Sequence, residues 1–136
     1  MNITKGREEE IINFIKGLKL DKKYQKEFTN EKIINILYVN ESLTHSSANS
    51  KVNYEKLEFL GDAVLRLIAS DFIKNKYPYM NVGERSELRS HLVSDQWLEE
   101  VGKKINIKSV LVIGQKAIRD KSANSTIQAE ATEALI

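Results

Sequence analysis

The stretch from residue 53 to residue 76 constrains the fold most, because it places acidic residues inside an apolar helical pattern. Its apolar residues recur at the spacing of an α-helix, which advances about 100° per residue. One apolar strip begins at Leu57, and a second strip on the far side contains Phe59 and Leu67. A helix that is apolar on two sides is expected to be buried on both, against its own domain or a partner.

Three carboxylates, Glu55, Glu58 and Asp62, fall in the gap between the two strips. Burying them is costly, because the charges lose water and repel one another unless a cation neutralises them. The pattern therefore predicts a metal site. The chain has no cysteine and two histidines, which leaves carboxylates as the ligands and favours a hard ion such as magnesium or manganese.

A second acidic pair, Glu130 and Glu133, lies near the end of the sequence, three residues apart and therefore on one helix face. If this helix packs against the helix over residues 53–76, the pair meets Glu58 and Asp62. Helical proteins build metal sites from carboxylates on facing helices in this way. Spacing alone leaves open the alternative that these are ordinary exposed acids on amphipathic helices.

The apolar spacing is helical through most of the sequence, and one proline and six glycines interrupt it little, so an all-α fold is expected. Helices are predicted over residues 8–18, 30–37 (with Asn30 as N-cap), 53–76, 82–93 and 95–104. Residues 110–113 fit a strand or part of a helix, and residues 115–124 fit a loop. A capping box of Ser125 and Gln128 is expected to open a final helix. That helix is still periodic at Ile136, so we expect a fragment with a truncated C-terminal helix.

The chain has 136 residues, enough for one domain over residues 1–136. Hydrophobic residues make up 41% and charged residues 29%, which is typical of a soluble globular protein. The sequence contains neither an apolar run of membrane-spanning length nor the apolar region of a signal peptide, so a cytoplasmic protein is expected. The net charge of +2 neither demands nor excludes a nucleic-acid partner.

Two segments resemble motifs of the ribonuclease III family. Y-E-K-L-E-F-L-G-D-A-V-L, beginning at Tyr54, resembles the family signature E-R-L-E-F-L-G-D-[AS]-V-L, and I-Q-A-E-A-T-E-A-L-I, beginning at Ile127, resembles I-L-A-D-A-x-E-A-L-I. Residues 43–47, 83–93 and 113–116 resemble further family motifs in the same order. The resemblance covers residues 31–136.

The resemblance implies a helical endonuclease domain that acts as a homodimer and cleaves double-stranded RNA with Mg²⁺, for which Mn²⁺ is a substitute. It implies products with 5′-phosphates and short 3′ overhangs and a role in rRNA or mRNA processing. It implies neither a small-molecule cofactor nor a membrane partner. Nothing in the sequence resembles the double-stranded-RNA-binding domain that usually follows in this family.

Four acids take their expected roles from the resemblance. Glu58 and Asp62 match catalytic, metal-binding acids of the signature helix, and Glu133 matches the catalytic glutamate of the second motif, also a metal ligand. Glu130, the fourth expected metal ligand, stands where the family usually has aspartate.

The remaining expected site residues come from the same resemblance. Glu55 and Glu84 match auxiliary acids near the cleavage site, and Phe59 matches an aromatic residue that contacts the partner subunit. Late basic residues would contact RNA phosphates, the alternative being that they form an ordinary solvated surface: Lys116, Arg119 and Lys121.

Two other functions stay open. The added methylene of Glu130 is compatible with a catalytically weak or inactive dimeric relative that binds double-stranded RNA during RNA maturation. A helical carboxylate bundle that binds metal for another purpose is the third possibility. His45 is interpreted as a capping or packing histidine rather than a base, because metal-dependent hydrolysis needs no histidine.

Overall fold

The computed structural model of the chain describes residues 3–22 and 33–136. These residues contain no β-strand, and their only strand-like pairing is one isolated parallel bridge between Thr44 and Val112. The expected all-α fold is therefore confirmed. The helical elements are α1 (Lys5–Gly17), α3 (Ile33–Ser42), α4 (Glu55–Lys76), α5 (Val82–Leu92), α6 (Asp95–Lys104), the 3-10 turn η1 (Ile107–Ser109), α7 (Gln115–Ile118) and α8 (Ala123–Leu135).

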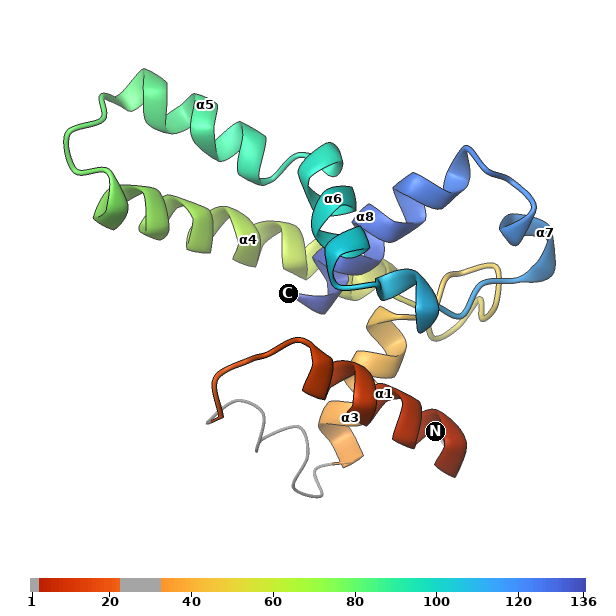
Figure 1. Cartoon of the computed structure of the whole chain (residues 1–136). Coiled ribbons are helices and arrows are strands. Elements are labelled where there is room, and N and C mark those ends of the chain that lie inside the picture. Colours follow the sequence, from red (N-terminus) through yellow and green to blue (C-terminus); the bar gives the residue numbers. More distant parts are fainter. Residues whose placement is uncertain (1–2, 23–32) are drawn as a thin grey trace.

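Helix α8 is central to the packing (Figure 1). Its contacts with α6 and with α4 are more extensive than those between any other two described elements. Its apolar residues join side chains of α1, α3 and η1 in one buried core, because small and branched residues recur on one face of each helix. The core includes Ile11, Ile15, Ile36, Val39, Leu43, Ile107, Val110, Ile127 and Ala131. This core fixes α8 in the middle of the protein.

Helices α4 and α5 run side by side in opposite directions and extend away from this core (Figure 1). Helix α4 ends at Lys76, as expected from Pro78, which disfavours helix in the residue before it. Helix α5 begins with a capping box. The Asn81 side chain accepts a hydrogen bond from the Glu84 N–H at 3.0 Å, and the Glu84 carboxylate accepts one from the Asn81 N–H at 2.9 Å.

Two expected helices have different bounds in the N-terminal half. Helix α1 spans Lys5–Gly17 rather than residues 8–18, and α3 continues to Ser42 rather than ending at residue 37. The expected N-cap Asn30 lies outside the described residues. The last turns of α3 contribute Val39 to the core, so burial extends the helix beyond the point that the local pattern indicated.

Two expected boundaries differ in the C-terminal half. The expected loop over residues 115–124 contains α7, and α8 begins at Ala123, so Ser125 is not its N-cap. Asp120 takes the capping role instead, because its carboxylate accepts hydrogen bonds from the Ser122 and Ala123 N–H groups at 3.0 and 3.3 Å. A hydrogen bond from the Ser122 hydroxyl at 2.6 Å, followed by these two backbone bonds, holds the pKa of Asp120 below its usual range.

The ambiguous apolar run over residues 110–113 forms neither a strand nor a helix. It follows η1, and Val112 alone pairs with Thr44, exchanging backbone hydrogen bonds with the flanking residues Leu43 and His45. This pairing ties the turn before α4 to the segment before α7. Within the described part of the chain, no helix is long and apolar enough to cross a membrane.

Candidate functional site

The acidic residues gather where α4 packs against α8. Gly61 is buried at this contact, and a Cβ added there would overlap the backbone oxygen of Glu133 and lie 2.8 Å from its carbonyl carbon. Only glycine permits this close approach. The approach brings the Glu58 and Asp62 turns of α4 to the level of Glu133 on α8.

Glu133 is half-buried and surrounded by negative charge. Burial is the largest cause that raises its pKa, to about 7, and the carboxylates of Asp62, Glu58 and Asp95 raise it further. Arg66 acts in the opposite direction. Glu133 therefore exchanges a proton near neutral pH in the metal-free protein.

Glu58 shows the same environment from the α4 side. Burial raises its pKa, followed by the charges of Glu130, Glu55 and Asp95. The mutual effects place acids of three helices in one region, which we call the acidic cluster: Glu58, Asp62, Asp95, Glu130 and Glu133. The expectation that the acidic pair of α8 meets Glu58 and Asp62 of α4 agrees with this packing.

Two of these acids form specific bonds to neighbouring residues. The Tyr54 hydroxyl donates a hydrogen bond to Oε2 of Glu130 at 2.5 Å. Arg66 donates from Nε to Oδ1 of Asp62 at 2.8 Å, as an exposed i,i+4 pair. Exposed pairs of this kind contribute only about 0.3–0.5 kcal/mol, so Arg66 is easily displaced.

The expected convergence of four carboxylates on one ion is not preformed. In residues 3–22 and 33–136, no group of three or more histidine, aspartate and glutamate side chains is arranged to hold a metal ion. The physical reason is that like charges repel and turn to other donors, as Asp62 does to Arg66 and Glu130 to Tyr54. The donor chemistry still suits a hard cation, since every acid offers oxygen, and Glu133 is partly buried beside the negative charges of Asp62, Glu58 and Asp95.

Sequence reasoning missed Asp95, the first residue of α6. Ser94 caps this helix by accepting from the Trp97 N–H at 3.2 Å, which places Asp95 in the first turn. An acid at this position is usually explained by the helix dipole alone. Its proximity to Glu58 and Glu133 arises from the packing of α6 against α8, for which the local sequence carries no signal.

The two expected auxiliary acids lie at opposite ends of the α4–α5 pair. Glu55 is exposed in the first turn of α4 and contributes to the raised pKa of Glu58. Glu84 belongs to the α5 capping box, beyond the far end of α4, and a helix of 22 residues spans about 33 Å. Within one chain Glu84 therefore does not join the acidic cluster.

Helix α4 carries large exposed apolar residues on both strips, which together we call the apolar α4 face. Phe59 is 82% exposed, so the second strip is uncovered within one chain. The first strip is also only partly buried within one chain, since Leu60, Ile68 and Phe72 are exposed. Burial of both strips, against the domain or a partner, therefore stays a prediction. The apolar α4 face comprises Phe59, Leu60, Leu67, Ile68 and Phe72.

The three expected RNA-contacting residues are exposed. Lys116 lies on α7, and Arg119 and Lys121 follow it before α8 begins. His45 packs as expected rather than standing free. Its ring lies edge-on to Tyr54 with centroids 5.6 Å apart, and Nδ1 lies 2.6 Å from the Ser47 hydroxyl oxygen.

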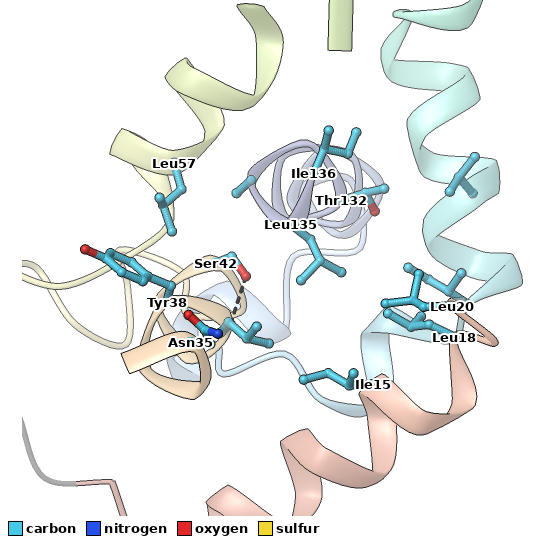
Figure 2. A pocket seen from close by; sticks show the side chains of 14 residues that line it. Ile15, Leu18, Leu20, Asn35, Tyr38, Ser42, Leu57, Thr132, Leu135 and Ile136 are labelled. Atoms are coloured by element: carbon cyan, nitrogen blue, oxygen red, sulfur yellow. Dashed lines mark hydrogen bonds between the residues drawn. The ribbon is translucent and has the colours of Figure 1, made fainter. Parts of the chain in front are cut away.

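An apolar pocket of about 610 Å³ lies apart from the acidic cluster (Figure 2). Side chains of α1, α3, α4 and α8 point into it, among them Ile15, Leu57 and Leu135 (Figure 2). The one hydroxyl hydrogen bond drawn there is internal to α3, from Ser42 to the Val39 carbonyl oxygen at 2.8 Å. None of the described residues that line the pocket has a charged side chain, so it offers no carboxylate to a metal and no cationic side chain to a phosphate.

Comparison with known proteins identifies the family of this chain. Residues 35–136 match the family model described as ribonuclease-III-like. The chain belongs to the ribonuclease-III-like family. It is 56% identical to ribonuclease 3 of Prochlorococcus marinus over 98 residues, which are 72% of this chain and 39% of that protein. Ribonuclease 3 of Legionella pneumophila is 39% identical over 103 residues, which are 75% of this chain and 46% of that protein.

The solved structures that resemble this ribonuclease-III-like chain agree with its fold. The nuclease domain of ribonuclease III from Campylobacter jejuni, in a study of a region involved in dimer formation, matches with a TM-score of 0.71 and 25% identity, covering 81% of this chain and 78% of that one. A second structure of that nuclease domain matches with a TM-score of 0.68 over 98% of this chain and 80% of that one, at 22% identity, and supports the fold alone. The expected family is thus confirmed, and the chain spans less than half of the two relatives named above.

Proposed function

We propose that this chain is a nuclease domain, over residues 1–136, that cleaves double-stranded RNA by metal-dependent hydrolysis as a homodimer. The observation that carries the proposal is the acidic cluster at the contact of α4 and α8 in a ribonuclease-III-like chain. The products would carry 5′-phosphates and short 3′ overhangs, and the biological role would be rRNA or mRNA processing.

Glu58, Asp62, Glu130 and Glu133 would hold Mg²⁺, or Mn²⁺ in its place. Their oxygen atoms and excess negative charge suit such an ion. When bound, the metal would lower the pKa of water and stabilise the leaving oxygen. The chain's own contribution is to hold these carboxylates on two tightly packed helices, with Gly61 permitting the approach.

The apolar α4 face supports the homodimer part of the proposal. Several large exposed apolar residues on one helix are typical of a protein interface, and Phe59 is the most exposed of this set. Two copies would supply two acidic clusters, one for each RNA strand. Lys116, Arg119 and Lys121 would contact phosphates, since duplex RNA is recognised mainly through its shape and backbone.

A cleavage assay on a labelled RNA duplex with Mg²⁺ tests the proposal. Wild-type protein is expected to cut the duplex, and Glu133→Gln is expected to lose at least 100-fold in rate while remaining folded, on the order seen when one catalytic group is removed. The matched control is Glu87→Gln, the same change at an exposed position on α5, which should cut normally. Duplex binding without cleavage at high protein and metal concentrations would refute the enzymatic proposal.

The second candidate function is a non-catalytic, dimeric protein that binds double-stranded RNA during RNA maturation. The observation that favours it is Glu130, whose carboxylate bonds to Tyr54 where the family motif usually has the shorter aspartate. In that case wild-type protein and Glu133→Gln would bind duplex RNA equally, and neither would cut it. The cleavage assay therefore separates the two functions directly.

A further inference from the structure

Tyr54 bonds directly to a member of the acidic cluster, although it lies outside the cluster itself. Its side chain is 2% exposed, and its hydroxyl donates to Oε2 of Glu130 at 2.5 Å across 76 positions of sequence. We propose that Tyr54 is a positioning residue that holds Glu130 for metal binding. This inference rests on the proposed function.

Tyr54 is itself held firmly at the start of α4. Its N–H donates to the Thr44 carbonyl at 3.0 Å, and its carbonyl accepts from the Glu58 N–H at 2.8 Å. The His45 ring packs against the Tyr54 ring. The position of the Tyr54 hydroxyl is therefore fixed, as is required of a residue that orients another group.

Ser47 holds His45 in turn, and Gly114 holds Ser47. Its Nδ1 accepts from the Ser47 N–H at 3.1 Å, and the Ser47 hydroxyl accepts from the Gly114 N–H at 2.9 Å. Gly114 packs so closely on Ser47 that an added Cβ would lie 2.9 Å from its carbonyl carbon. The turn before α4 and the segment before α7 thus support Tyr54 from behind.

The hydrogen bond from Tyr54 is compatible with metal binding by Glu130 because it occupies only one of the two carboxylate oxygens. The hydroxyl engages Oε2 of Glu130, so Oε1 stays available to a cation. Tyr54 is a neutral donor, and it orients the carboxylate without cancelling its charge, unlike Arg66 beside Asp62. Hydrogen-bonded partners of this kind typically change metal affinity by 10- to 100-fold.

The length of Glu130 belongs to the same arrangement. An aspartate is shorter by one methylene, about 1.5 Å, and at this position of α8 it would draw its carboxylate away from the hydroxyl. The glutamate thus lets the carboxylate reach Tyr54. A purely structural role, in which Glu130 only satisfies a buried hydroxyl, makes a different prediction for metal affinity.

A double-mutant cycle distinguishes the two roles. Mn²⁺ binding is measured from the loss of the aqueous Mn²⁺ resonance in electron paramagnetic resonance, on wild type, Tyr54→Phe, Glu130→Asp and the double variant. We expect Tyr54→Phe and Glu130→Asp each to weaken Mn²⁺ affinity about tenfold. We expect no additional loss when both changes are combined. Tyr79→Phe, which removes a hydroxyl from a fully exposed ring, should bind like wild type.

Several outcomes would overturn the positioning role. Unchanged Mn²⁺ affinity in Tyr54→Phe would do so, as would the absence of Mn²⁺ binding by wild type. The role would also be overturned if Tyr54→Phe weakened Mn²⁺ affinity by the same factor in the presence and absence of Glu130→Asp. If circular dichroism shows that Tyr54→Phe does not fold, the Glu130→Asp variant alone tests the role. A Mn²⁺ affinity of Glu130→Asp equal to that of wild type then refutes it. Failure of wild type to cut duplex RNA would refute the proposed function separately.

Discussion

Gly61 of α4 lies directly against the backbone of Glu133 on α8, with no space for a side chain between them. The obstacle is a carbonyl group rather than the end of a flexible side chain, so the neighbouring helix cannot yield by changing a rotamer. The packing of the helices and the composition of the acidic cluster therefore depend on the same residue.

Replacing Gly61 by alanine should destabilise the protein and separate the acids. We expect Gly61→Ala to lower the free energy of unfolding by about 1–3 kcal/mol, the usual cost of overpacking, and to slow duplex cleavage. Urea unfolding followed by circular dichroism measures the first effect. Gly6→Ala on α1, where an added Cβ meets nothing within 4 Å, should be neutral or slightly stabilising. Equal stability of the two variants would contradict the close approach.

The pKa of Glu133 predicts how metal-free stability depends on pH. A carboxyl raised from 4.5 to about 7 binds more protons in the folded state, so it stabilises the fold fully below pH 4.5. That contribution is lost as the pH rises through 7. Relative to Glu133→Gln, wild type should lose on the order of 1 kcal/mol between pH 4.5 and 8 in EDTA, after allowing for solvent screening of this half-buried group.

Chemical unfolding of both proteins across this pH range provides the measurement. Glu87→Gln on α5 serves as the control, and its difference from wild type should stay constant with pH. Added Mg²⁺ should restore the stability of wild type above pH 7, because an ion that binds only the folded state stabilises it by mass action. If the stability of wild type relative to Glu133→Gln increased with pH over this range, the environment assigned to Glu133 would be contradicted.

The apolar α4 face predicts the effect of Phe59 on assembly. Phe59→Ala should shift the protein toward monomer in sedimentation velocity, because an exposed aromatic ring at an interface buries a large apolar area in the complex. Its helix content should not change, since the ring is 82% exposed within one chain. Ile118→Ala, an exposed apolar residue on α7, should leave assembly unaltered. A dimer that persists in Phe59→Ala at wild-type affinity would argue against this face.

The exposed basic residues before α8 predict the salt dependence of RNA binding. Each phosphate contact contributes about 0.7–0.9 to the slope of log affinity against log salt concentration. The combined changes Lys116→Gln, Arg119→Gln and Lys121→Gln should therefore reduce that slope by about 2–3, as measured by fluorescence anisotropy on a short duplex with Ca²⁺ in place of Mg²⁺.

A matched set of charge removals on α1 and just beyond it serves as the control for this experiment. Lys5→Gln, Lys16→Gln and Lys19→Gln remove the same charge from other exposed positions and should leave the slope nearly unchanged. Equal effects of the two sets would show a general charge effect rather than a defined RNA contact.

Much of the helical framework followed from local patterns. The helix over residues 53–76 and its end before Pro78 were predicted, because apolar periodicity and proline act within a few residues. The start of α8 was predicted at Ser125 and lies at Ala123, since Asp120 reaches forward to cap it. Apolar periodicity does not distinguish between N-caps that lie close together in the sequence, so only the folded backbone defines the start of α8.

The sequence by itself determined the family, the all-α fold and the acidic residues of two helices, because these depend on residue order and helical spacing. Only the tertiary structure decided that Asp95 joins Glu58 and Glu133, that Tyr54 holds Glu130, and that Glu84 lies far from them within one chain. Such relationships join residues far apart in sequence through the packing of α4, α6 and α8. Charge repulsion and the available donors then decide where each carboxylate points.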